Sequence, residues 1–125
     1  MSTLKVNTIQ NTSAAHSSTP QQIAEGRAKI WVNFDGEGTV SIRDDFNVSS
    51  ITDNGTGDYT VNFSTNMSND DYAALVTPQR KAGTSEATAD LFTLNSNNVR
   101  VLTLRVDSGA NLDVGNVCVA IFGDQ

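Results

Sequence analysis

The sequence DNGTGDYTVNF occupies residues 53–63 and joins a turn to a strand. Asp, Asn and Gly dominate residues 53–58, and these residues favour turns because Asx side chains bond nearby backbone and glycine adopts positive φ angles. Residues 59–63 alternate apolar and polar side chains, which is the period of a strand with one buried face. This stretch therefore predicts a turn inside a β-sheet, with the Asx side chains bonding their own backbone.

The same combination of alternation and turn residues recurs along the chain. Strands are predicted over residues 28–34, 39–43, 46–51, 59–63, 72–77, 89–94, 99–106 and 117–122. Their spacing of roughly 8–12 residues is typical of a β-sandwich or barrel. We therefore expect an all-β fold, an antiparallel, jelly-roll-like β-sandwich of about eight strands over residues 27–125.

Residues 1–26 have a different character and are expected to form an extended N-terminal arm. Residues 11–20 are small, polar and without period, so they cannot bury enough apolar surface to fold alone. Leu4, Val6 and Ile9 form a short apolar patch near the start of the arm. We expect this patch to anchor the arm on a partner.

One helical turn is predicted inside the arm. Pro20 has the fixed φ angle that suits the first position of a helix, and Ser18 or Thr19 can cap the backbone before it. Residues 21–25 supply enough chain for a single turn.

The composition excludes several classes of partner. The 125 residues include 8 Lys and Arg against 14 Asp and Glu, for a formal net charge of −6. A nucleic-acid binder needs clustered positive charge, and an anionic membrane surface attracts basic segments, so neither partner is expected. No apolar run approaches the ~20 residues that span a bilayer, and the first ten residues lack the pattern of a signal peptide. We expect folding in a cytoplasm.

No catalytic or metal-binding constellation is recognisable, so we expect neither an enzyme nor a cofactor. His16 is the single histidine and falls in the arm, where it cannot be held beside a nucleophile. Cys118 falls in the most apolar segment, residues 117–122, which is expected to be covered on both faces. We interpret Cys118 as a small buried hydrophobe.

Acidic turns are weighed as metal sites and rejected. Residues 53–58 lack the alternating acids and final glutamate of a helix-flanked calcium loop. Asp44 and Asp45 are adjacent, so on a strand they would point to opposite faces, and a turn with solvated charges is expected there.

Trp31 is the residue singled out for contact between subunits. In a regular strand over residues 28–34 it points away from Ile30 and Val32. A large bare aromatic on a sheet is an aggregation liability. Packing against a neighbouring subunit is therefore favoured over an exposed platform for sugar.

Three segments together resemble a module of tailed bacteriophages, especially marine ones. They are GRAKIWVNFDG at residues 26–36, VSIR at 40–43 and FNVSSITDNGTGDYTVNF at 46–63. The opening LKVNTIQN, residues 4–11, is similar to the start of phage fibre-type proteins that carry the module. The resemblance implies a trimeric protein of the virion surface without catalytic residues, which either decorates the capsid or forms part of a fibre.

Chain length favours the first of these two roles. A short arm and one domain suit a capsid decoration (cement) protein whose arm lies across the major capsid protein or another virion protein. The alternative is a tail-fibre tip that binds host glycan through loops at residues 79–88 and 107–115. A stand-alone sugar-binding module would instead need an aromatic platform around Trp31, Tyr59 or Tyr72.

Overall fold

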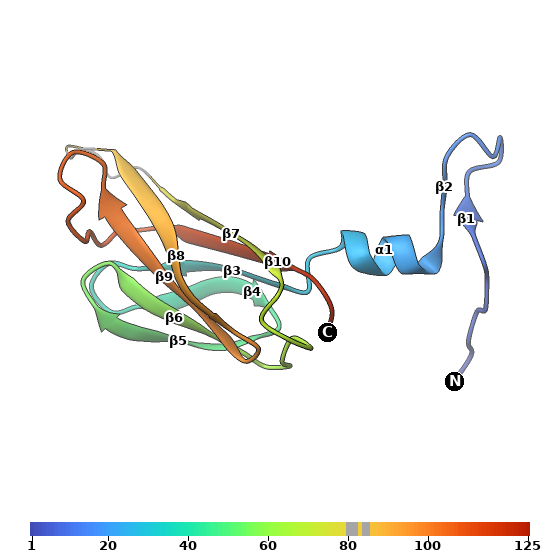
Figure 1. The fold of residues 1–125 in the computed structure, drawn as a ribbon, viewed down its shortest axis with the longest axis horizontal. Coiled ribbons are helices and arrows are strands. Elements are labelled where there is room, and N and C mark those ends of the chain that lie inside the picture. The colour runs from blue at the N-terminus through green and yellow to red at the C-terminus, as the bar shows by residue number, and fades with distance from the viewer. Residues whose placement is uncertain (80–82, 84–85) are drawn as a thin grey trace.

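The computed structural model describes residues 1–79, 83 and 86–125 and is built mainly of strands (Figure 1). Its elements are β1 (Ile9–Gln10), β2 (Ser17–Ser18), α1 (Pro20–Gly26), β3 (Ile30–Asp35), β4 (Ser41–Phe46), β5 (Val48–Gly55), β6 (Asp58–Phe63), β7 (Ala73–Pro78), β8 (Ala87–Asn95), β9 (Asn98–Arg105) and β10 (Val117–Phe122). Strands β3 to β10 overlap the eight predicted segments one by one. The predicted all-β fold is confirmed.

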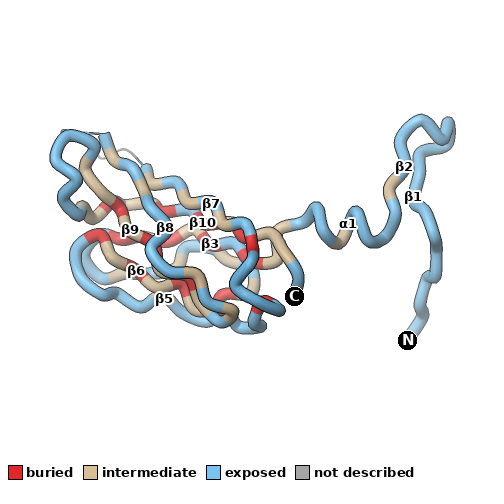
Figure 2. The backbone as a smooth tube through the Cα atoms, in the orientation of Figure 1, coloured by how far each residue is buried: buried red, intermediate tan, exposed pale blue. Residues whose placement is uncertain are grey.

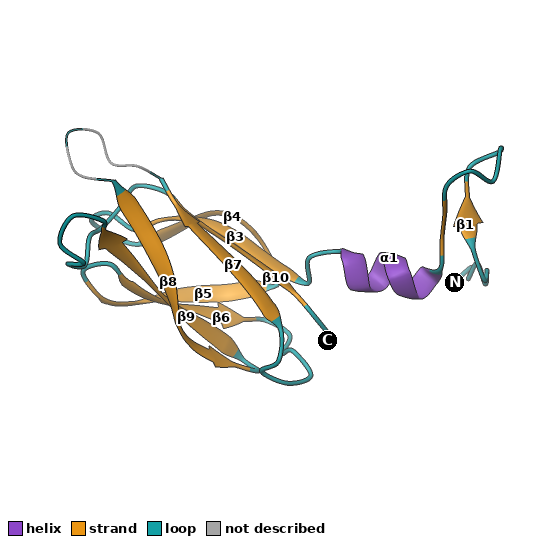
Figure 3. Ribbon diagram, turned by 45° about the horizontal axis from the view of Figure 1, so that its top comes forward, coloured by secondary structure: helices purple, strands orange, loops and turns teal. Residues whose placement is uncertain are grey.

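These eight strands form two four-stranded antiparallel sheets packed face to face (Figure 3). One sheet has the order β4-β3-β10-β7 and the other β5-β6-β9-β8. Three connections, β3–β4, β5–β6 and β8–β9, are hairpins within a sheet, and β10 returns to lie between β3 and β7. Half of the loop predicted over residues 79–88, namely residues 80–82 and 84–85, lies outside the described residues, and residues 87–88 belong to β8 instead.

The core lies between the two sheets, where alternate side chains of the central strands meet (Figure 2). In β3 and β10 these are Ile30, Val32, Phe34, Val117, Val119 and Ile121, and in β6 and β9 they are Tyr59, Val61, Phe63, Val99, Val101 and Thr103. Phe34 and Tyr59 meet across the layers with ring centroids 5.2 Å apart in an edge-to-face arrangement. The period-two pattern of the sequence thus selects the core face of each strand.

The turn predicted at Asp44 and Asp45 is wrong. Both residues belong to β4, where they pair with Asn33 and Val32 of β3. The chain turns at Asn47 instead, which adopts a positive φ of 61°. Asparagine tolerates this left-handed conformation better than most residues. The Asp45 carboxylate accepts a hydrogen bond from the Val48 amide at 3.2 Å and so closes the turn from the β4 side.

The prediction of a buried Cys118 is also wrong, because Cys118 is exposed. Strand β10 is central in its sheet, but only Val117, Val119 and Ile121 point into the core. Cys118 and its alternate neighbours point outward, where none of the described residues forms a further layer over the sheet. Strand β10 is therefore apolar on both faces, although the described residues of the single chain cover only one of them.

Residues 1–26 include β1, β2 and α1 and are not extended throughout. The first two strands form a small antiparallel hairpin, and α1 begins at the predicted Pro20. Thr19 caps α1, and its own amide donates to Gln22 Oε1 at 2.9 Å, completing a capping box. No residue from 1 to 27 is buried, and Figure 1 shows this segment standing away from the two sheets. The division of the chain into an arm and a sandwich domain stays a prediction.

Candidate functional site

An apolar row crosses the outer face of the β4-β3-β10-β7 sheet. Phe46, Trp31, Ala120 and Leu75 lie directly opposite one another on the four successive strands. The relative exposure is 51% for Phe46, 37% for Trp31 and 56% for Leu75. A shallow groove of about 270 Å³ runs beside the row and is also lined by Cys118. The predicted outward orientation of Trp31 is thus observed, and its role in a subunit contact stays a prediction.

Charged side chains flank this apolar row. Asp44, Asn33, Cys118 and Thr77 form the neighbouring cross-strand row. On the other side lies Lys29, which immediately precedes β3 and is two residues before Trp31. Further along the face, Arg43 forms an ion pair with Asp35 at 2.8 Å. A hydrogen bond from the Glu37 amide, and then Arg43, lower the pKa of the Asp35 carboxyl.

The outer face of the opposite sheet is polar and hydrogen-bonded to itself. The Asn62 amide donates to Ser50 Oγ at 3.1 Å and to Thr52 Oγ1 at 2.9 Å, tying β6 to the edge strand β5. Arg100 Nε donates to Asp58 Oδ1 at 2.8 Å, and this bond lowers the pKa of Asp58. These contacts leave a face suited to water, in contrast to the apolar row on the other side of the sandwich.

Arg100 also covers the aromatic ring that this second face exposes. Its guanidinium carbon lies 4.7 Å from the centroid of the Phe92 ring, within the range of a cation–π contact. Phe92 is exposed but has this cation over its ring, whereas the rings of the apolar row lie beside other apolar side chains. The two outer faces therefore differ in how their aromatic residues are partnered.

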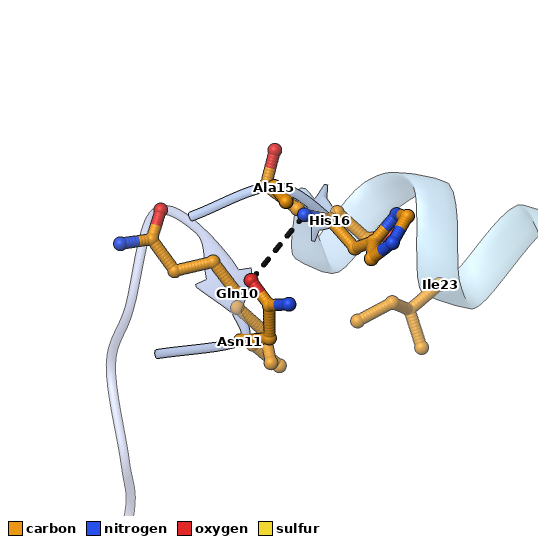
Figure 4. Close-up of a pocket in the computed structure, with 8 residues that line it drawn as sticks. Gln10, Asn11, Ala15, His16 and Ile23 are labelled. Atoms are coloured by element: carbon orange, nitrogen blue, oxygen red, sulfur yellow. Dashed lines mark hydrogen bonds between the residues drawn. The ribbon is translucent and has the colours of Figure 1, made fainter. Parts of the chain in front are cut away.

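The predicted anchoring residues Leu4, Val6 and Ile9 are all exposed. Ile9 belongs to β1 and lines a hollow of about 730 Å³ between the small hairpin and α1, together with His16 and Ile23 (Figure 4). The His16 amide donates to Asn11 Oδ1 at 3.4 Å across this hairpin. Leu4 and Val6 precede the hairpin, so the structure does not bring the three apolar side chains into one cluster.

A polar notch lies at the end of the sandwich where two loops meet. Its volume is about 420 Å³, and its lining is Ser68, Asn69, Asp70, Asn95, Ser96 and Asn97. The Met67 amide donates to the Ser96 carbonyl at 2.8 Å, and the Tyr72 hydroxyl donates to the Asn95 carbonyl at 3.1 Å. Sequence reasoning missed this notch because its two loops are separated by more than twenty residues. Polar loop residues were the only signal that could have pointed to it.

Neither tyrosine can contribute to the aromatic platform weighed for a sugar-binding module. Tyr59 is fully buried, and Tyr72 is 7% exposed. Burial raises the pKa of Tyr72 to about 12, since its ionised form is disfavoured away from water. Trp31 therefore has neither tyrosine beside it on the surface.

Tyr59 instead holds the loop at residues 107–115 against the sandwich through a hydrogen bond. Its hydroxyl donates toward Asp113 Oδ1 and the Gly36 carbonyl, both at 2.8 Å. Asp113 Oδ1 also accepts the Gly57 amide at 2.7 Å. Burial, and then the bond to Asp113, raise the pKa of Tyr59 far above its ordinary value. The loop predicted as a binding element in a fibre tip is thus fixed at its base.

The turn predicted at residues 53–58 is shorter than expected, because β5 extends to Gly55 and β6 begins at Asp58. The expected Asx bond is present, with the Gly55 amide donating to Asp53 Oδ1 at 2.9 Å. Among residues 1–79, 83 and 86–125, no three His, Cys, Asp or Glu side chains gather as metal ligands would. No helix in that part of the chain has the length and apolar character to cross a bilayer. Comparison with protein-family models, curated proteins and solved structures finds no match to this chain.

Proposed function

We propose that this chain is a structural protein of a bacteriophage particle, which decorates the outside of the capsid and is anchored there by residues 1–26. The partner would be the major capsid protein or another virion protein. The proposal starts from the resemblance carried by residues 26–36, 40–43 and 46–63. The fold and the N-terminal segment add physical support.

The observation that carries the proposal is a helix whose start is specified in the sequence but which buries no side chain. Helix α1 has a complete capping box and Pro20 at its first position, yet it is only seven residues long and none of them is buried. Isolated helices of this length are marginal in water. A surface outside this chain would supply the missing burial, and the exposed Leu4, Val6 and Ile9 would be buried with it.

The charge distribution supports the same arrangement. All but one of the 14 acidic residues lie in residues 27–125, and the exception is Glu25. The segment that would lie on the capsid is therefore nearly neutral, while the sandwich carries the net charge of −6. A charged, self-bonded outer face keeps a densely covered particle in solution.

The test is rebinding of the purified chain to particles that have been stripped of it. We expect the full chain to saturate the particles, and the triple variant Leu4→Ser, Val6→Ser, Ile9→Ser to lose at least about tenfold in affinity. A chain lacking residues 1–26 should not rebind. The matched control is Thr3→Ser, Asn7→Ser, Gln10→Ser, which changes the interleaved polar positions and should bind normally.

The place of binding decides between head and tail. Gold-tagged antibody against residues 79–88 should label the head of particles in electron micrographs. Equal rebinding by the triple variant and the control would overturn the anchoring role. Label confined to the tail would overturn capsid decoration and favour a fibre component.

The polar notch favours a second candidate, a fibre tip that binds host glycan. Hydroxyl-rich ligands need clustered hydrogen-bonding groups, and the notch offers six polar residues around about 420 Å³. Titration of the isolated chain with host surface glycan should then shift the NMR signals of residues 68–70 and 95–97. Asp70→Ala should abolish those shifts, and an unchanged spectrum on glycan addition would exclude this candidate.

A further inference from the structure

One outer face of the single chain leaves an apolar row exposed, formed by Phe46, Trp31, Ala120 and Leu75. It extends without interruption across all four strands of its sheet. The opposite outer face of the sandwich has bonded networks such as Asn62 with Ser50 and Thr52 in the equivalent place. On that opposite sheet Phe92 is also exposed, but Arg100 lies over its ring. A continuous apolar row that crosses a whole sheet indicates a contact surface.

The charges beside the row are placed on opposite flanks. Lys29 lies two residues from Trp31 on one side, and Asp44 lies two residues from Phe46 on the other, since β3 and β4 run antiparallel with Trp31 opposite Phe46. Asp44 is therefore about 6.6 Å from the row along the strand direction, and Lys29 immediately precedes β3 on the other side. Neither has an ion-pair partner among the residues that the structure describes.

We propose that a second copy of this chain packs on this face, with a two-fold axis running along the apolar row. Rotation about that axis places each row residue opposite its own counterpart and exchanges the two flanks. Lys29 of one copy then lies opposite Asn33 of the other copy. Asp44 of that other copy is on the next strand, about 4.8 Å to the side. Each flank of the dimer thus brings Lys29 of one copy within reach of Asp44 of the other.

The same charges disfavour burying this face around a three-fold axis. Three sheets with parallel strands would bring Lys29 level with Lys29 and Asp44 level with Asp44, which places like charges together. The trimer implied by the resemblance would therefore have to use another surface. The pairing proposed here does not depend on whether the chain belongs to a virus particle.

The dimensions of the face predict a weak pair. Four strands about 4.8 Å apart and six residues about 3.3 Å apart give a footprint of roughly 19 by 20 Å, or about 380 Å² per copy. Specific interfaces bury about 800 Å² per partner. We therefore expect a concentration-dependent dimer, which dissociates on dilution and is favoured where many copies are held close together.

The test is sedimentation equilibrium of the full chain over a range of concentrations. The mass should rise from 13.3 kDa toward twice that value. Trp31→Ser or Leu75→Ser should raise the dissociation constant at least about tenfold, since central aromatic and aliphatic contacts dominate such interfaces. Phe92→Ser is the matched control, because Phe92 is as exposed as Leu75 but lies on the other sheet, and it should leave the mass unchanged.

A charge exchange tests the orientation without removing apolar surface. Lys29→Glu and Asp44→Lys should each weaken the pair several-fold, and the double variant should restore it. Asp90→Lys, an exposed change on the other sheet, controls for net charge. Circular dichroism of every variant verifies that the fold is retained.

Cross-linking supplies a measurement that does not rely on weakening the pair. Ala120 should face its own counterpart, so Ala120→Cys in a Cys118→Ser background should be joined by a short bis-maleimide reagent. Thr60→Cys on the opposite sheet in the same background should not. A chain that stays monomeric at millimolar concentration, a three-fold mass, or a double charge variant as weak as its parents would overturn the proposal.

Discussion

Replacing Tyr59 with phenylalanine removes one buried hydroxyl and leaves the rest of its packing intact. Tyr59 is fully buried, and its ring meets Phe34 edge to face, a contact that phenylalanine keeps. The hydroxyl lies 2.8 Å from both Asp113 Oδ1 and the Gly36 carbonyl. The variant therefore removes the hydroxyl's contacts with Asp113 and with the Gly36 carbonyl, and the Asp113 contact holds residues 107–115 against the sandwich.

The expected loss follows from the acceptor. Hydrogen bonds to charged groups contribute about 1.5–3 kcal/mol, about twice the value for a neutral pair. Asp113 Oδ1 keeps the Gly57 amide at 2.7 Å, so it is not left wholly without a donor. We expect Tyr59→Phe to lower the free energy of unfolding by about 2 kcal/mol, or the melting temperature by roughly 6–10 °C for a chain of this size.

Urea denaturation followed by circular dichroism measures this change. The midpoint should fall while the slope stays constant, because the surface exposed on unfolding is nearly the same. Tyr72→Phe is the control, since its hydroxyl lies 3.1 Å and 3.2 Å from the neutral Asn95 and Asn98 carbonyls, and it should lose only about 1 kcal/mol. A loss under about 0.5 kcal/mol for Tyr59→Phe, or no coupling to Asp113→Ala in a double-mutant cycle, would refute the reasoning.

Three further predictions rest on other parts of the structure. Gly57→Ala should lower the free energy of unfolding by more than about 3 kcal/mol in the same urea assay, because Gly57 has a φ of 61° and an added Cβ would lie 2.7 Å from the Leu112 amide nitrogen. The free energy of unfolding should fall between about pH 10 and pH 12, by up to ~1.4 kcal/mol per pH unit for each buried tyrosine. The reason is that the folded state raises the pKa of Tyr72 to about 12, so the stabilisation from its neutral hydroxyl is lost as the pH rises through that pKa. Melting curves recorded across this pH range measure the loss. Cys118 should react with a maleimide in the folded chain as fast as a free thiol does, and protection that appears only at high concentration would indicate the pairing proposed above.

The strands and the core could be predicted because their signal is local. Alternation in residues 59–63 reports which side chains of β6 are buried, and the structure places Tyr59, Val61 and Phe63 in the core as that period requires. The capping residues around Pro20 likewise encode the start of α1 within a few positions. Such features depend on backbone period and turn chemistry, which neighbouring residues determine.

The errors and omissions all involve contacts with other strands or loops. Asp44 and Asp45 belong to a strand rather than a turn because β3 pairs with them through a register shift after Asn33. Cys118 is exposed because the described residues cover its sheet on one face only. The apolar residues on both faces of β10 do not indicate how many layers cover the strand.

The sequence by itself determined the all-β class, the positions of the eight strands and the inward face of most of them, because side-chain alternation and turn residues act over a few bonds. Only the tertiary structure decided the strand order β4-β3-β10-β7, and with it the row that aligns Phe46, Trp31, Ala120 and Leu75. Those four residues come from strands up to about ninety positions apart. Their alignment is set by how the whole chain buries its core, since no local pattern encodes which strand will lie beside which.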